Sequence, residues 1–316
     1  MQRSAVALSL NHRIRLLLLL AHPNARRLHE SIPTRTVLTA PVRWPSMRRT
    51  EAAMDDPKQI LVEREGHAAR VTINRPSRRN ALSFAAWQSL AAAFDNLAAD
   101  PEVRVVVLTG AGERAFCAGN DISEFAEKRS TPEQIEAYDA VLSHAYQIIR
   151  DFEKPIVARV RGFAVGGGFE LMQLCDLQIA SAGARFAMTP ARLGLGYRLD
   201  DVQLLVDRIG PRAAREMLFT GRLFDADEAE RLGFVTRVVP DEDLDATVDA
   251  CVAEITASAP LSVRAIKVAI GESLKPPADR DHARCDALAA ACNRSEDYRE
   301  GQNAFAERRP PEFRGR

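Results

Sequence analysis

The sequence has no excess of either charge, because 43 Lys and Arg residues balance 43 Asp and Glu residues over 316 positions. A chain without a basic surplus gives no indication of a nucleic-acid partner. Its longest apolar runs, such as the one at 16–21, are far shorter than the roughly 20 residues that span a bilayer. The sequence therefore predicts no nucleic-acid or membrane partner, and its 46% hydrophobic content is typical of a globular protein.

Cysteine is also scarce, and no CxxC pair occurs. An odd number of cysteines without paired spacing predicts free thiols in a reducing compartment, buried as small hydrophobic residues. The six histidines form neither HExxH nor another paired ligand spacing, so we expect no metal site. The five cysteines are Cys117, Cys175, Cys251, Cys285 and Cys292.

Several nucleotide and hydrolase motifs are missing. The chain has no GxxxxGK[ST] and no GxSxG, which excludes phosphate-loop and α/β-hydrolase chemistry. The segment "VVVLTGAGERA" resembles a dinucleotide fingerprint, but residues 119–121 interrupt the helix that the fingerprint requires. No acid follows a second strand at the expected distance, so the sequence predicts no nicotinamide or flavin cofactor.

Residues 1–54 differ in composition from the rest, with five arginines before the first acid, Glu30. An Arg-rich, acid-poor beginning is typical of a mitochondrial transit peptide, and the leucine run would also suit a secretory signal. A start codon placed too far upstream is a third explanation, with Met47 or Met54 as the true start. We expect this N-terminal extension to lie outside the fold.

Strands and helices alternate from residue 55 onward. The apolar runs at 102–110, 155–160 and 176–181 read as buried strands, with helical segments between them. A hairpin at 59–74 precedes them, and Ser83 is a suitable N-cap for the helix that follows. Strands separated by helices predict an α/β fold with a mostly parallel sheet.

Helices dominate from about residue 212, apart from one predicted strand at 233–239. We place the core at 55–255 and a helical C-terminal section at 256–316. A section without a sheet of its own must pack on the core or on a neighbouring subunit.

Two glycine-bearing loops each follow a predicted parallel strand, at 115–125 and 162–171. Ligands bind beyond the carboxyl ends of such strands, and glycine lets backbone N–H groups approach them. Two converging N–H donors and a helix N-terminus would form an oxyanion hole, with Glu170 in the first helical turn as proton carrier. Alternatively, the glycines serve close packing and Glu170 caps the helix.

Six segments carry a family resemblance: "RRNALS", "AFCAGNDISEF", "KPIVARVRGFAVGGGFELMQLCDLQIAS", "ARFAMTPARLGLG", "FTGRLFDADEAERLGFVTRVV" and "SEDYREGQNAFAERRPPEF". In this order they resemble the crotonase (enoyl-CoA hydratase/isomerase) superfamily, from about 58 to 315. The resemblance implies a spiral ββα domain, a helical C-terminal trimerisation section and a homotrimer or dimer of trimers. It also implies an acyl-CoA thioester substrate and no separate cofactor.

The resemblance carries over to particular residues. Asn120 and Gly167 would supply the oxyanion-hole N–H groups, and Glu170 would be the first of the two hydratase carboxylates. Asn80 would lie near the CoA nucleotide, and Phe305 would reach a neighbouring subunit's CoA. The remaining substrate-binding positions implied are Ala81, Leu82, Ala118, Asp121, Ile122, Ser123 and Gly166.

The second hydratase carboxylate is missing. Hydratases carry F-x-x-P-E at this place, and the frame that begins at Phe186 puts Pro190 in the glutamate position. Proline cannot transfer a proton. Asp200 or Asp201 could replace the lost acid, or Tyr197 could orient a carboxylate.

The function predicted is an enoyl-CoA hydratase acting through a thioester enolate. Isomerisation, decarboxylation and thioester hydrolysis by the same superfamily are alternatives, as is a catalytically weak acyl-CoA-binding protein. The tail also resembles methylmalonyl-CoA decarboxylases, although these carry His at the position of Asn120. We expect a cytoplasmic protein, or one of the mitochondrial matrix if residues 1–54 are a transit peptide.

Overall fold

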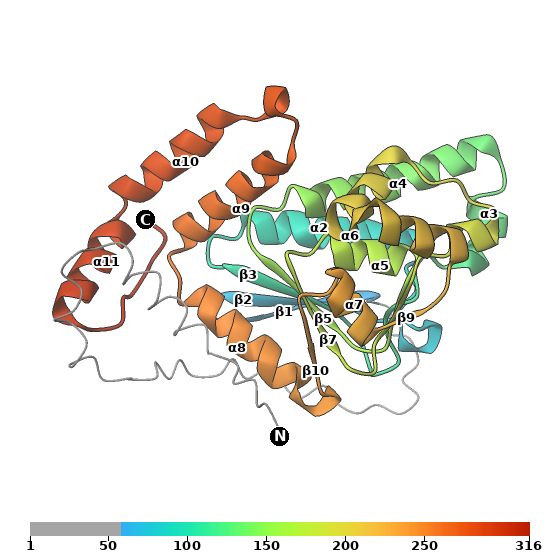
Figure 1. Ribbon diagram of the computed structural model, residues 1–316, viewed down its shortest axis with the longest axis horizontal. Coiled ribbons are helices and arrows are strands. Elements are labelled where there is room, and N and C mark those ends of the chain that lie inside the picture. Colours follow the sequence, from blue (N-terminus) through green and yellow to red (C-terminus); the bar gives the residue numbers. More distant parts are fainter. Residues whose placement is uncertain (1–57) are drawn as a thin grey trace, which may run out of the picture. The chain divides into compact units, whose positions relative to one another are not determined.

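Two β-sheets form the centre of the computed structural model, which describes residues 58–316 (Figure 1). The expected extension over 1–54 lies outside the described residues. The larger sheet has the strand order β1–β2–β3–β5–β7–β10, parallel except for the β1–β2 pair. Its strands are β1 (Ile60–Glu65), β2 (Ala68–Ile73), β3 (Val105–Gly110), β5 (Ile156–Val160), β7 (Leu177–Ser181) and β10 (Arg237–Val239).

The predicted strands β1, β2, β3, β5 and β7 of this sheet are confirmed. The hairpin β1–β2 turns at Gly66, whose φ of 56° suits a residue without a side chain. All residues of β2, β3 and β5 are buried, as the strands of a parallel sheet covered on both faces should be.

A second, smaller sheet was not predicted. It has the order β4–β6–β8–β9, and only its β8–β9 pair is antiparallel. Each parallel strand follows a strand of the larger sheet directly, so the chain repeats strand, short strand and helix. This repeat is the ββα spiral that the resemblance implied. The strands are β4 (Ala115–Cys117), β6 (Phe163–Val165), β8 (Arg185–Ala187) and β9 (Phe224–Asp225).

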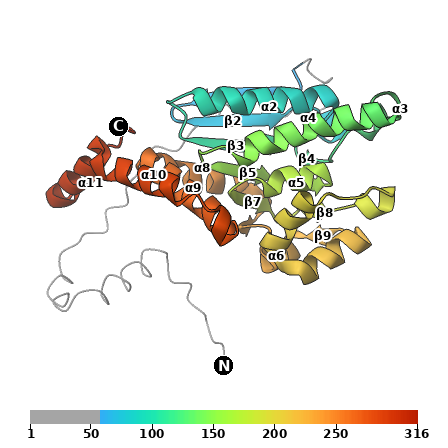
Figure 2. The same cartoon turned by 90° about the horizontal axis from the view of Figure 1, so that it is seen from above.

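Helices cover both faces of the larger sheet. On one face, α2 (Phe84–Ala99) and α4 (Pro132–Arg150) lie side by side (Figures 1 and 2). The predicted N-cap is confirmed, because the Ser83 side chain accepts a hydrogen bond from the Ala86 N–H. On the other face, α8 (Leu244–Thr256) packs its buried residues against Val107 and Val157.

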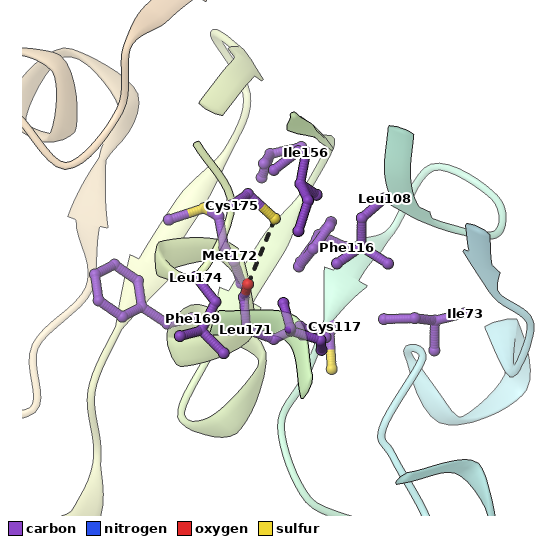
Figure 3. Packing of buried hydrophobic residues seen from close by; sticks show 14 of the residues in the cluster. Ile73, Leu108, Phe116, Cys117, Ile156, Phe169, Leu171, Met172, Leu174 and Cys175 are labelled. Carbon is purple, nitrogen blue, oxygen red and sulfur yellow. Dashed lines mark hydrogen bonds between the residues drawn. The ribbon is translucent and has the colours of Figure 1, made fainter. Parts of the chain in front are cut away.

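The short helix α5 (Gly167–Gln173) lies inside the core. Figure 3 shows its residues Leu171 and Met172 among side chains from both sheets, including Leu108 of β3 and Phe116 of β4. Since α5 is packed on several sides, its first turn has a fixed position relative to the strand ends. That first turn carries Glu170.

The strand predicted at 233–239 is shorter than expected. Only β10, Arg237–Val239, forms, because Phe234 and Val235 turn into the core after α7 (Ala226–Leu232). The helix α6 (Leu199–Thr220) places Asp200 and Asp201 in its first turn. α6 breaks at Gly210, before Pro211.

The C-terminal section consists of α9 (Pro260–Leu274), α10 (His282–Arg294) and α11 (Glu296–Glu307). Lys267 of α9 forms an ion pair of 2.7 Å with Asp176, which also accepts the backbone N–H of Ile156 at the start of β5. Arg104 donates to the carbonyl oxygens of Thr256 and Phe313. These contacts attach the helical section to the amino ends of the central strands β3, β5 and β7.

Candidate active site

The two glycine-bearing loops meet at the ends of β4 and β6. Gly119 has a φ of 96°, and a Cβ there would lie 2.9 Å from the Val165 carbonyl oxygen and 3.3 Å from the Gly167 nitrogen. A side chain at Gly119 would therefore push the loops apart. Glycine is required here because the backbones of the two loops approach each other closely.

Gly168 supports the packing explanation for one glycine of the triplet. A Cβ on Gly168 would lie 2.2 Å from the Cys117 carbonyl oxygen, which no side chain could accommodate. Gly168 thus lets α5 rest directly on β4. The triplet serves packing at Gly168, whereas Gly167 lies beside the space where the loops converge.

Two backbone N–H groups are placed to act as donors. Leu82 donates to the Gly119 carbonyl at 2.8 Å, and Asp121 donates to the Leu82 carbonyl at 2.9 Å. Asn120 lies between Gly119 and Asp121 in this parallel bridge, so its own N–H points away from Leu82. Gly167 is the first residue of α5, and its N–H is one of those that a helix cannot satisfy internally.

The side chain of Asn120 is fixed by Trp87 of α2. The indole Nε1 donates to Asn120 Oδ1 at 2.9 Å. A Cβ on Gly167 would lie 3.3 Å from this same oxygen and 3.3 Å from the Tyr146 hydroxyl. The two candidate donors therefore border one small region, together with Trp87 and Tyr146.

Glu170 follows Gly167 by one helical turn. Its Oε2 accepts a hydrogen bond of 2.8 Å from the Tyr146 hydroxyl. Its Oε1 is buried without a hydrogen-bond partner among residues 58–316. Burial raises the pKa of Glu170 to about 7, with a smaller upward contribution from the charge of Asp201. The Tyr146 hydrogen bond, Tyr197 and Arg198 oppose this rise because they favour the carboxylate.

The sequence left Tyr197, Asp200 and Asp201 open as replacements for the missing acid. Tyr197 faces Glu170 and favours its charged form, although the contact does not reach the geometry of a full hydrogen bond. Asp201 acts on Glu170 electrostatically and forms an ion pair of 3.5 Å with Arg198. Asp200 is exposed to solvent. Of the two aspartates, Asp201 is the one close to Glu170.

Pro190 is the residue that the resemblance places at the position of the second hydratase glutamate. It is buried and begins a short 3-10 helix, Pro190–Leu193. A proline suits the first position of such a turn because its φ is already restricted and its missing N–H is not needed there. The position therefore has a structural role in this chain and offers no proton donor.

Several predicted binding residues have structural contacts of their own. The side chain of Asn80, at a φ of 57°, donates to the carbonyl oxygens of Ala111 and Ala115. Asp121 forms an ion pair of 2.9 Å with Arg75 and accepts the Ser123 hydroxyl. Leu82 is fully buried, whereas Ala81, Ala118 and Gly166 are partly exposed and Ile122, Ser123 and Phe305 are exposed.

The five cysteines are free, and Cys117 and Cys175 are buried. Burial raises the pKa of the Cys117 thiol to about 12, so this cysteine beside the loops stays protonated and is not a nucleophile.

Within residues 58–316, no group of three or more His, Cys, Asp or Glu residues could hold a metal ion. In that same part of the chain, no helix has the length and apolarity to cross a membrane.

Sequence reasoning missed Trp87 and Tyr146 as parts of the site. Trp87 lies on the helix predicted after Ser83 but was not expected at the site, and Tyr146 was not singled out. Each lies on a helix remote in sequence from the loop that it supports, 33 residues from Asn120 and 24 residues from Glu170. A helical spacing shows that such a residue is buried, but it does not show which polar group it meets.

The fold and these loops define an α/β enzyme class built on a ββα spiral. The model of the enoyl-CoA hydratase/isomerase family matches residues 63–316. The chain is 34% identical over 250 residues to a short-chain-enoyl-CoA hydratase of Clostridium acetobutylicum, covering 79% of this chain and 95% of that protein. It is 36% identical to an (E)-benzylidenesuccinyl-CoA hydratase of Thauera aromatica, covering 81% and 99%.

Solved structures agree with these relatives. A crystal structure of an enoyl-CoA hydratase/carnithine racemase from Magnetospirillum magneticum superposes with a TM-score of 0.78 at 38% identity, covering 84% of this chain and 97% of that one. The chain therefore belongs to the enoyl-CoA hydratase/isomerase family, and the resemblance inferred from the six segments is confirmed.

Proposed function

We propose that this protein is an enoyl-CoA hydratase that adds water across the 2,3-double bond of an acyl-CoA thioester, with Glu170 as its proton-transferring group. The observation that carries the proposal is the position of Glu170, one turn after Gly167, with one buried oxygen unpaired and a pKa of about 7. A group with a pKa near the working pH can both accept and return a proton.

The reaction begins with the thioester carbonyl oxygen bound to the N–H groups of Asn120 and Gly167. Ionised Glu170 takes a proton from water while the water oxygen bonds to C3, and the electrons of the double bond move into a thioester enolate. The proton on Glu170 then passes to C2, which restores the carbonyl and the carboxylate. Each oxyanion donor of this kind contributes about 3–4 kcal/mol to transition-state stabilisation.

A single carboxylate can complete this cycle because the proton removed from water equals the proton given to C2. Pro190 contributes no acid, so the role of the second carboxylate falls partly to Asp201. Its negative charge raises the basicity of Glu170. We propose Tyr197 as a further group at the carboxyl, and Asp200 as a surface residue without a part in the reaction.

We propose that the acyl-CoA substrate binds along the two glycine-bearing loops. In this proposal Ala81, Leu82, Ala118 and Gly166 contribute backbone to the path, and Asp121 holds the loop through Arg75. Exposed Ile122 and Ser123 face the pantetheine arm. Phe305, which is 88% exposed, extends toward the CoA of a neighbouring subunit.

Double-bond isomerisation is the second candidate, and Pro190 is the observation that favours it. Moving a double bond needs one base that removes a proton from one carbon and returns it to another. A site with one carboxylate and no second acid meets that requirement without holding a water molecule.

The test is to incubate the full chain with crotonyl-CoA, 3-enoyl-CoA and a malonyl-type thioester, and to identify products by mass spectrometry. A mass increase of one water on crotonyl-CoA supports the hydratase. An isomer of 3-enoyl-CoA without hydration of crotonyl-CoA would replace it with the isomerase. Loss of carbon dioxide or release of free CoA as the main reaction would replace both.

We also propose a homotrimer or a dimer of trimers. Ile266, Ile270 and Leu274 of α9 recur at intervals of four residues and are all more than half exposed. Such a stripe on one helix face is favourable only when another surface covers it. We propose that a second copy of the chain covers it, which would also bring Phe305 to a neighbouring site.

For the compartment, we propose the cytoplasm, or the mitochondrial matrix if residues 1–54 are a transit peptide. Both are reducing, which agrees with five free cysteines.

A further inference from the structure

Tyr146 lies between the two halves of the candidate site. Its ring is buried on α4 and meets Trp87 edge to face, with ring centroids 5.2 Å apart. Its hydroxyl donates to Glu170 Oε2 at 2.8 Å, while Trp87 donates to Asn120 Oδ1 at 2.9 Å. One aromatic pair thus contacts both the candidate proton carrier and the residue that supplies an oxyanion donor.

We propose that Tyr146 is a positioning residue that holds Oε2 of Glu170 and thereby leaves Oε1 as the oxygen that exchanges the proton. The proposal rests on the proposed function, because it names which atom of Glu170 performs the transfer. It adds a residue from α4 to a site otherwise formed by the two loops, α2, α5 and the start of α6.

The geometry supports a distinction between the two oxygens. The terminal torsion of a glutamate is broad, so an unrestrained carboxyl would exchange its oxygens freely. The buried Tyr146 ring fixes the donor and therefore the oxygen that it binds. The other oxygen is buried without a hydrogen-bond partner among the described residues, which leaves its lone pairs for a substrate or a water molecule.

The surrounding charges agree with this role. The phenol of Tyr146 stabilises the charged form and lowers the pKa of Glu170 against the effect of burial. Tyr197 and Arg198, from the segment that leads into α6, act in the same direction, whereas Asp201 of α6 acts in the opposite one. Burial and the Glu170 charge raise the pKa of Tyr146 well above its ordinary value, so the phenol remains a donor throughout the useful pH range.

The same helix offers a matched control. Tyr138 lies two turns before Tyr146, is equally buried, and has a hydroxyl without a hydrogen-bond partner in the part of the chain that the structure describes. Its ring packs against Phe84 and Phe125 instead. Tyr138→Phe and Tyr146→Phe therefore each remove one buried hydroxyl from α4. Only Tyr146→Phe removes a hydroxyl that is bonded to Glu170.

The experiment measures kcat and KM for crotonyl-CoA hydration against pH in the wild type and both variants. For Tyr146→Phe we expect the acidic limb of kcat to move to higher pH, kcat to fall about 10-fold and KM to change little. The loss follows because Oε2 is no longer held by a hydrogen bond, and a 10-fold change in kcat corresponds to about 1.4 kcal/mol. For Tyr138→Phe we expect the wild-type profile.

A second measurement separates this inference from the function itself. The carboxyl of Glu170 is titrated by infrared difference spectroscopy, with Glu170→Gln to identify its band. A higher pKa of Glu170 in Tyr146→Phe, and an unchanged one in Tyr138→Phe, supports the positioning role even for a different reaction. An unchanged pKa in Tyr146→Phe, or the same shift in both variants, would overturn it. Absence of hydration by the wild type would instead overturn the proposed function.

Discussion

Glu170 is held between opposing influences. Burial favours its neutral form, while Tyr146 and Arg198 favour the carboxylate. The result is a pKa of about 7 for Glu170. At pH 7 a glutamate carboxyl in water would be almost fully ionised. A carboxylate with this raised pKa is a stronger base than an exposed glutamate, which is useful for removing a proton from water. The neighbours of Glu170 therefore matter as much as its position.

Asp201 provides a test at this scale, with Asp200 as its control. Asp201→Asn removes a charge that raises the pKa of Glu170, and it also releases Arg198, which lowers that pKa. We expect the acidic limb of the hydration rate to move to lower pH and the rate above pH 7 to fall, because Glu170 becomes a weaker base. The measurement is the pH dependence of kcat.

Asp200→Asn removes an adjacent but exposed charge and should leave the profile unchanged. Equal shifts in the two variants would mean that general surface charge, rather than Asp201, acts on Glu170. A shift to higher pH in Asp201→Asn would contradict the electrostatic account.

At the scale of elements, the strongest sequence signals were those that repeat over many residues. The strands β3, β5 and β7 were predicted because each is rich in apolar residues, and the start of α2 was predicted from its N-cap. The strands β4, β6, β8 and β9 were missed because two or three residues cannot display an alternation. Tyr146 was missed because its partner on α5 is set by tertiary packing.

The contact between α5 and β4 predicts a severe effect of one methyl group. Gly168→Ala would place a Cβ 2.2 Å from the Cys117 carbonyl oxygen, which forces α5 away from β4. We expect a loss of about 3 kcal/mol or more in the free energy of unfolding, since backbone must move. Denaturant-induced unfolding measures this.

Gly271→Ala in α9 is the matched control, because nothing lies within 4 Å of its Cβ position. Alanine is the better helix former, so this variant should gain about 0.5–1 kcal/mol. A mild effect of Gly168→Ala, similar to that of Gly271→Ala, would show that α5 does not rest on β4 as described.

At the scale of the whole molecule, the order of the parts was predictable, and the contacts between distant segments were not. The helical C-terminal section was predicted because strand patterns become rare after residue 212. Its attachment through Lys267 to Asp176, 91 residues apart, depends on a fold that no local pattern contains. The departure at Pro190 could be identified only against the family's motif, and the nearby charge of Asp201 only from the structure.

The exposed stripe on α9 makes assembly testable. Introducing a charge with Ile270→Lys should disrupt an apolar contact between subunits and lower the mass seen by analytical ultracentrifugation from a trimer or hexamer to a monomer. Glu254→Lys introduces a lysine at an exposed position of α8 and should leave the mass unchanged. A monomeric wild type, or an unaltered assembly of Ile270→Lys, would contradict the proposed role of this stripe.

The most direct test of the account is the rate of crotonyl-CoA hydration by the wild type and by Glu170→Gln, measured above pH 7 with the fold of both confirmed by circular dichroism. Glutamine keeps the shape of the side chain but cannot carry the proton. The account predicts hydration by the wild type and a loss of about 10²–10⁴-fold in the variant, the usual contribution of general acid–base catalysis. Equal rates, or no hydration by the wild type, would contradict it.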